Sequence, residues 1–118
     1  MLVLPIKKKW FDMILSGKKP EEYRDFTPYW KGRFANEFSL DRDTFLPTDR
    51  VMRPVLFRNG YSKDSPSFKA FCVLSDVREG NPAWGAEKGK KYYVLRILKV
   101  CGGKDKMIVK GDDGFGNV

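Results

Sequence analysis

The apolar positions at the start of the chain predict a strand followed by a short helix. Residues 2–6 are apolar and β-prone, which indicates a strand packed on both faces. After a run of lysines, apolar side chains recur at helical spacing and form a single stripe, made of Trp10, Phe11, Ile14 and Leu15. Gly17 can take a positive φ and Pro20 blocks continuation, so we expect the helix to end just before Lys19.

Residues 21–26 predict the next strand. Because side chains alternate along a strand, Glu22 and Arg24 should project to one face, and Tyr23 and Asp25 to the other. The two opposite charges are therefore expected to share a face.

Three more strands are predicted further along the chain. Residues 51–58 precede Asn59-Gly60, a dipeptide typical of hairpin turns. Residues 68–77 and 92–100 are largely apolar on both faces, a pattern that suits a closed or nearly closed sheet. The expected fold class is thus α+β, mostly β: a small β-barrel with flanking helices.

Two segments give weaker signals. Residues 27–50 contain Pro28, Gly32 and Asn36 among a few aromatic residues, and we expect mostly loop there. The domain is predicted to cover residues 1–100, and residues 101–118 to form a glycine-rich tail with one edge strand at most.

The residue composition excludes several kinds of catalytic and metal-binding site. The 118 residues contain no histidine, which excludes Ser-His-Asp and Cys-His nucleophilic sites and zinc sites built on histidine. Cys72 and Cys101 are not in a CxxC arrangement, so we expect neither a metal site nor a cofactor, and buried thiols suit a reducing cytoplasm. The N-terminus lacks the order of a signal peptide, and no apolar stretch reaches the roughly 18 residues of a membrane span.

The net charge is +8 and the sequence pI about 9.6, values typical of nucleic-acid-binding domains. Basic residues near the N-terminus, among them Lys7 and Lys9, are interleaved with aromatic ones, a mixture that serves phosphate attraction and base stacking. The apolar stripe predicts that Trp10 is part of the core. Trp30 fits no periodic pattern of apolar positions, so it either lines a cleft or is buried. The alternative interpretation of the charge is a soluble protein kept apart by self-repulsion, and we expect a monomer under both interpretations.

The sharpest cluster is Lys19, Glu22 and Arg24. If the helix exit and the following strand face a cleft, an ammonium, a carboxylate and a guanidinium converge there. The alternative is a solvent-exposed ion-pair face, which would contribute about 0–1 kcal/mol.

The segment Gly17-Lys18-Lys19-Pro20-Glu21-Glu22-Tyr23-Arg24 fits the pattern G-x-K-x-x-E-x-R and resembles the signature of the ASCH family in the PUA-like superfamily. In that family the signature also lies between a first helix and the next strand. The resemblance extends loosely to the segment around Trp84 and to the strand that follows it. It implies a small β-barrel whose signature residues line a cleft suited to a nucleotide or RNA.

The resemblance also implies roles. Lys19 would meet a phosphate or a polarised carbonyl, Glu22 would accept a hydrogen bond from a base or sugar, and Arg24 would hold Glu22 or a second phosphate. One branch of the superfamily resembles amidohydrolases acting on acetylated cytidine, with a threonine nucleophile at the position of Glu22, and this chain lacks that threonine. Other members resemble ribonucleases.

We therefore expect an RNA- or nucleotide-binding module, with Lys7, Lys9, Lys19, Glu22, Arg24, Trp30 and Trp84 as its candidate ligand-binding residues. The alternative is a histidine-independent hydrolase, a ribonuclease or modified-nucleoside amidohydrolase, in which Lys19 and Glu22 share proton transfer. A third possibility is a domain whose basic face meets an acidic protein.

Overall fold

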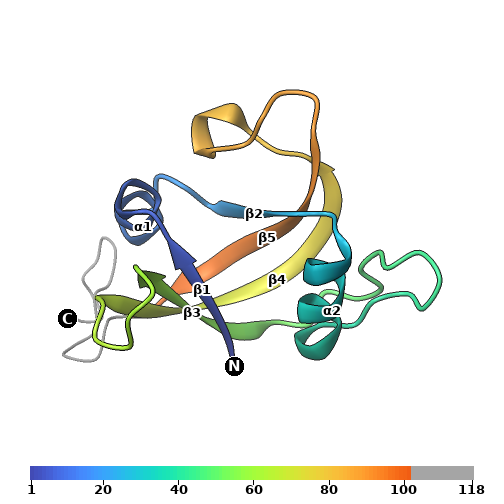
Figure 1. The fold of residues 1–118 in the computed structure, drawn as a ribbon, viewed down its shortest axis with the longest axis horizontal. Helices are drawn as coiled ribbons and strands as arrows, with labels where there is room; N and C mark the ends of the chain where they lie inside the picture. Colours follow the sequence, from blue (N-terminus) through green and yellow to red (C-terminus); the bar gives the residue numbers. More distant parts are fainter. Residues whose placement is uncertain (102–118) are drawn as a thin grey trace.

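Strands are the commonest regular elements in the structure, a computed structural model that describes residues 1–101 (Figure 1). In chain order the elements are β1 (Leu2–Ile6), α1 (Lys8–Leu15), β2 (Glu21–Asp25), α2 (Pro28–Glu37), β3 (Arg53–Asn59), β4 (Ser67–Glu79), the 3-10 helix η1 (Pro82–Trp84) and β5 (Lys91–Val100). The fold is therefore α+β and mostly β, as expected.

The strands form one five-stranded sheet in the order β1-β3-β4-β5-β2. The pair β1–β3 is parallel and the other pairs are antiparallel. Register shifts interrupt the β4–β5 pairing, and such irregularities increase the local twist. The sheet curls into a half-barrel, with α1 and α2 at the two ends of β2 (Figure 1).

A side chain links the two edge strands of this sheet. Arg24 on β2 donates a hydrogen bond from Nη2 to the carbonyl oxygen of Pro5 on β1, over 3.2 Å. The gap in the half-barrel is thus bridged at the place where the predicted charge cluster lies.

The core fills the inside of the curl and reaches both helices. Its fully buried large side chains come from β1, α1, α2 and the three central strands: Leu4, Ile14, Phe34, Val55, Phe57, Phe68, Leu74, Tyr93 and Leu95. On β1 only alternate residues are fully buried and the others are half-buried, so the expectation of a strand buried on both faces was too strong.

The predicted strands and the first helix are confirmed to within a few residues at each end. The sequence Asn59-Gly60 lies at the end of β3, which pairs antiparallel with the next strand. The connection is longer than a two-residue turn, because β4 begins only at Ser67.

The expectation of mostly loop between residues 27 and 50 was wrong for its first part, which forms α2. Thr27 caps the helix by accepting a hydrogen bond from the backbone N–H of Trp30, and Pro28 occupies the first turn, where its missing N–H costs nothing. Phe34 anchors the helix in the core, with its ring centroid 5.0 Å from that of Tyr93. Burial of this side chain outweighs the poor helix propensities of Gly32 and Asn36.

The predicted tail lies, from residue 102 onward, outside the described residues. Across the described part of the chain, neither helix has the length and apolar character needed to cross a bilayer.

Candidate functional site

The end of α1 directs Lys19 into the molecule. Gly17 has a φ of +86°, and the N–H groups of Gly17 and Lys18 donate to the carbonyl oxygens of Ile14 and Met13, over 3.0 and 2.8 Å. This double hydrogen bond is a Schellman ending, which reverses the chain without leaving the last carbonyl groups unpaired. The predicted role of Gly17 as the helix terminator is confirmed.

Lys19 is buried and its ammonium group is surrounded by acceptors. Only 1% of the residue is exposed. Its Nζ donates to the carbonyl oxygen of Glu21 over 2.8 Å and to that of Trp84, and lies 3.1 Å from Oε1 of Glu22. An ammonium has three N–H donors, so all of them are matched within the protein. Burial lowers the pKa of Lys19 from its ordinary value, and the negative charge of Glu22 opposes this shift.

Glu22 lies between two cations. Its Oε2 is 2.8 Å from Nη2 of Arg24, while Oε1 faces Lys19. The carboxylate is thereby fixed in place, and each oxygen keeps a further lone pair for a ligand. The predicted alternation along this strand holds, since Glu22 and Arg24 meet on one face.

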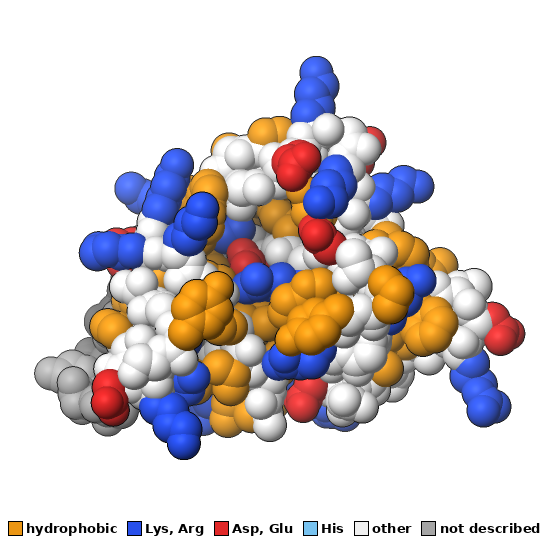
Figure 2. All heavy atoms as spheres, viewed as in Figure 1, with side chains coloured by type: hydrophobic (Ala, Val, Ile, Leu, Met, Phe, Trp, Pro, Cys, Tyr) orange, Lys and Arg blue, Asp and Glu red, His pale blue; other side chains and the backbone are white. Residues whose placement is uncertain are grey.

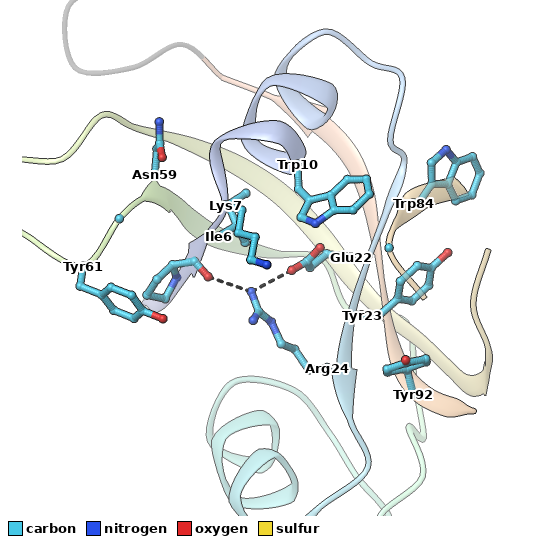
Figure 3. Close-up of a pocket in the computed structure, with 13 residues that line it drawn as sticks. Ile6, Lys7, Trp10, Glu22, Tyr23, Arg24, Asn59, Tyr61, Trp84 and Tyr92 are labelled. Atoms are coloured by element: carbon cyan, nitrogen blue, oxygen red, sulfur yellow. Dashed lines mark hydrogen bonds and ion pairs between the residues drawn. The ribbon is translucent and has the colours of Figure 1, made fainter. Parts of the chain in front are cut away.

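A pocket of about 470 Å³ opens over this ion-pair row. Its size falls within the range of about 300–1,000 Å³ typical of small-molecule sites. Figure 3 shows Glu22 and Arg24 at its centre, with Trp10 and Trp84 toward one side and Tyr61 toward the other. The ion pair therefore lies among aromatic rings, where a planar ligand could contact both.

The walls come from segments far apart in the chain. Its lining residues belong to the β1–α1 junction, β2, the turn after β3, the region of η1 and the start of β5: Pro5, Ile6, Lys7, Trp10, Glu22, Tyr23, Arg24, Asn59, Gly60, Tyr61, Trp84, Gly85 and Tyr92. Both edge strands of the half-barrel contribute, so the pocket occupies the gap between them.

Close packing against a glycine holds Trp10 in the wall. Gly85 ends η1 with a φ of +101°, and a Cβ atom at that position would lie 3.1 Å from the indole of Trp10. The carbonyl group of the preceding residue, Trp84, accepts from Lys19. The η1 turn is thus tied to α1 through Trp10 and to the ion-pair row through Lys19.

A second, partly buried network supports the same turn. Glu21 pairs with Arg78, with 2.6 Å between Oε2 and Nη2, and accepts a hydrogen bond from the hydroxyl of Tyr23. The hydroxyl oxygen of Tyr23 in turn accepts from the backbone N–H of Asn81. Burial alone would raise the pKa of Glu21, but the hydrogen bonds from Arg78 and Tyr23 outweigh it and lower that pKa.

Four of the seven predicted ligand-binding residues line the pocket: Lys7, Glu22, Arg24 and Trp84. Lys19 lies beneath it with its donors occupied. Lys9 is exposed on α1, with Nζ 4.7 Å from the ring centroid of Trp10. Trp30 lies on α2 next to the pocket, with its ring centroid 5.2 Å from Cζ of Arg24.

Four pocket aromatics were not predicted as site residues: Trp10, Tyr23, Tyr61 and Tyr92. Trp10 was assigned to the core by its apolar stripe; it is half-buried, packs against the core and also lines the pocket. Tyr61 follows the Asn59-Gly60 turn signal directly, and its 89% exposure is a signal that only the structure supplies. Tyr92 lies at the start of β5, where the apolar pattern predicted core. It is buried in a core cluster and also lines the pocket.

The surface around the pocket combines opposite charges with apolar groups. Figure 2 shows a central hollow with acidic and basic side chains at its base, and hydrophobic and basic side chains around it. Such a site offers an acceptor, donors and flat apolar walls.

Comparisons of the chain with models of protein families, with curated proteins and with solved structures find no match.

Proposed function

We propose that the protein is an RNA- or nucleotide-binding module whose pocket holds a nucleobase. The observation that carries the proposal is the pairing of aromatic walls with a fixed carboxylate and guanidinium in one pocket. Base stacking on aromatic side chains contributes about 1–3 kcal/mol per base, and Trp10, Trp84 and Tyr61 supply the rings. Glu22 can accept from a base amino or imino group while Arg24 donates to an adjacent base acceptor.

Charge supports the same proposal. Lys7 points into the pocket beside Glu22 and Arg24 (Figure 3), so a phosphate attached to a bound nucleoside would meet an ammonium group. Lys9 adds a second ammonium on the adjacent face of α1, where it lies over Trp10. The net charge of +8 favours an anionic ligand over the whole surface.

The resemblance to the ASCH family of the PUA-like superfamily points the same way. The signature residues Lys19, Glu22 and Arg24 form a continuous ion-pair row at the pocket, and the half-barrel is compatible with a PUA-like barrel. In this proposal Lys19 is a positioning residue, which fixes Glu22 and the backbone of Trp84 without touching the ligand.

The hydrolase alternative has weaker support. Its favourable observation is the lowered pKa of Lys19 caused by burial, since a proton-transfer lysine needs such a shift. However, Lys19 is 1% exposed and faces three protein acceptors, so a substrate atom would have to displace one of them. Turnover of modified nucleosides or labelled RNA that is lost in both Lys19→Ala and Glu22→Gln would favour the enzyme.

The binding proposal is tested at Tyr61, because this side chain lines the pocket and is too exposed to support the core. At low salt, isothermal titration with each of the four ribonucleoside 5′-monophosphates should give binding by the wild type. We expect Tyr61→Ala to weaken it at least about fivefold, equivalent to about 1 kcal/mol, and Tyr61→Phe to retain it. Absence of binding by every nucleotide, or equal affinity of Tyr61→Ala, would overturn the proposal.

A further inference from the structure

A second aromatic and basic surface lies on α2 beside the pocket. We name it the α2 ridge and define it by Tyr29, Trp30 and Arg33. Tyr29 is 60% exposed, whereas Phe34 on the same helix is fully buried. Phe34 and Trp30 therefore pack on the core and hold the helix in place, while Tyr29 faces outward.

The ridge is ordered by its own contacts. The rings of Tyr29 and Trp30 meet edge to face, with centroids 5.0 Å apart and an interplanar angle of 86°. Arg33 donates a hydrogen bond from Nη1 to the hydroxyl of Tyr29 over 2.7 Å, and its Cζ lies 5.7 Å from both ring centroids. The guanidinium thus fixes the rings, while most of the Tyr29 surface stays available.

Arg24 connects the ridge to the pocket. It lines the pocket, pairs with Glu22 and packs over Trp30, whose ring centroid is 5.2 Å from its Cζ. Figure 3 shows Arg24 between the pocket and α2, and Figure 2 shows hydrophobic and basic side chains over α2 next to the central hollow. One guanidinium therefore borders both surfaces.

None of the three ridge residues lines the pocket, so a mononucleotide bound there would not account for the ridge. Its composition is that of surfaces that bind single-stranded nucleic acids, in which successive bases stack on aromatic rings and cations follow the backbone. The charge is complementary as well, since Arg24, Lys31 and Arg33 all lie on or beside α2. Lys31 belongs to the same helix as the ridge, and its Nζ lies over the rings of Phe26 and Phe45.

We propose that the α2 ridge binds a second nucleotide next to the one in the pocket, so that the ligand is a single-stranded oligonucleotide rather than a mononucleotide. This inference rests on the proposed function of the pocket. Tyr29 stacks on the neighbouring base, Arg33 approaches the phosphate that follows it, and Arg24 lies at the junction of the two sites. RNA and single-stranded DNA share this chemistry.

The test compares ligand lengths by equilibrium titration at low salt. The probes are mononucleotides, dinucleotides and tetranucleotides of each base, in ribose and deoxyribose forms. We expect at least tenfold tighter binding of a dinucleotide than of the matching mononucleotide. Tyr29→Ala and Arg33→Ala should remove this gain and leave mononucleotide affinity unchanged, whereas the control Arg42→Ala, at an exposed position in the following loop, should keep it. A difference between the sugar series identifies the nucleic acid.

The outcomes separate the two proposals. Equal affinity for mononucleotides and oligonucleotides, or a gain that survives both ridge substitutions, overturns the ridge and leaves the pocket intact. Binding of neither ligand overturns both. Binding of an acidic peptide such as oligoglutamate that Tyr29→Ala and Arg33→Ala abolish, without any length-dependent gain for oligonucleotides, would instead assign the ridge to a protein partner.

Discussion

At the scale of single residues, the candidate site depends on a lysine that does not itself line the pocket. Lys19 brings together the carboxylate of Glu22, the backbone of β2 and the backbone of η1. Removal of Lys19 would leave Glu22 with one of its two counter-charges, Arg24, and would take a donor from the carbonyl oxygens of Glu21 and Trp84, and unmatched buried groups are costly. Lys19 is therefore a structural support for the ion-pair row and for the η1 turn.

We predict that Lys19→Ala destabilises the protein by about 3–5 kcal/mol, the cost typical of breaking a buried ion pair. The adjacent Lys18→Ala is the matched control, since Lys18 is exposed and its loss should change the free energy of unfolding by less than about 0.5 kcal/mol. Urea denaturation followed by tryptophan fluorescence measures both. Equal midpoints for the two variants would show that Lys19 does not support the fold.

At the scale of elements, the η1 turn and α1 form one wall because a glycine allows their contact. The left-handed φ of Gly85 ends the 3-10 helix, and the absence of a side chain admits the indole of Trp10. Another glycine in the connection to β5, Gly89, also has a positive φ, of +81°, but a Cβ there would meet nothing within 4 Å. A comparison of alanine substitutions at Gly85 and Gly89 therefore distinguishes the cost of backbone strain from the effect of steric overlap with Trp10.

We predict that Gly89→Ala costs about 1–2 kcal/mol through its left-handed backbone alone and leaves the pocket unchanged. Gly85→Ala should carry the same strain and additionally displace Trp10. Its tryptophan emission should shift and its nucleotide affinity should fall, while Gly89→Ala retains both. If the two variants are indistinguishable in emission and affinity, the packing of Trp10 on Gly85 does not shape the pocket.

The element α2 shows where sequence reasoning stopped short. Pro28, Gly32 and Asn36 suggested a loop, because each disfavours a helix interior. The segment nevertheless contains a threonine followed by proline, a pattern that starts helices, and aromatic residues spaced four apart that reach Phe34 in the core. Tertiary burial decided the outcome, and single-residue propensities do not carry that information.

At the scale of the whole molecule, the strands and the charge cluster were predictable and the pocket was not. Alternation alone placed Glu22 and Arg24 on one face, and the helix terminator placed Lys19 before them. The approach of Tyr61 and Trp84 to that cluster depends on the sheet order, which puts β1 and β2 at opposite edges of a sheet that then curls. Local patterns do not encode that closure.

The three tryptophans of the chain test the central claim most directly, because Trp10 and Trp84 line the pocket and Trp30 lies on the ridge. Their indole N–H signals can be followed by ¹H–¹⁵N NMR while a nucleoside 5′-monophosphate is added at low salt. We predict that the signals of Trp10 and Trp84 move with saturation and that the signal of Trp30 moves less. If none of the three signals moves at millimolar nucleotide, or only that of Trp30 does, the pocket is not a nucleotide site.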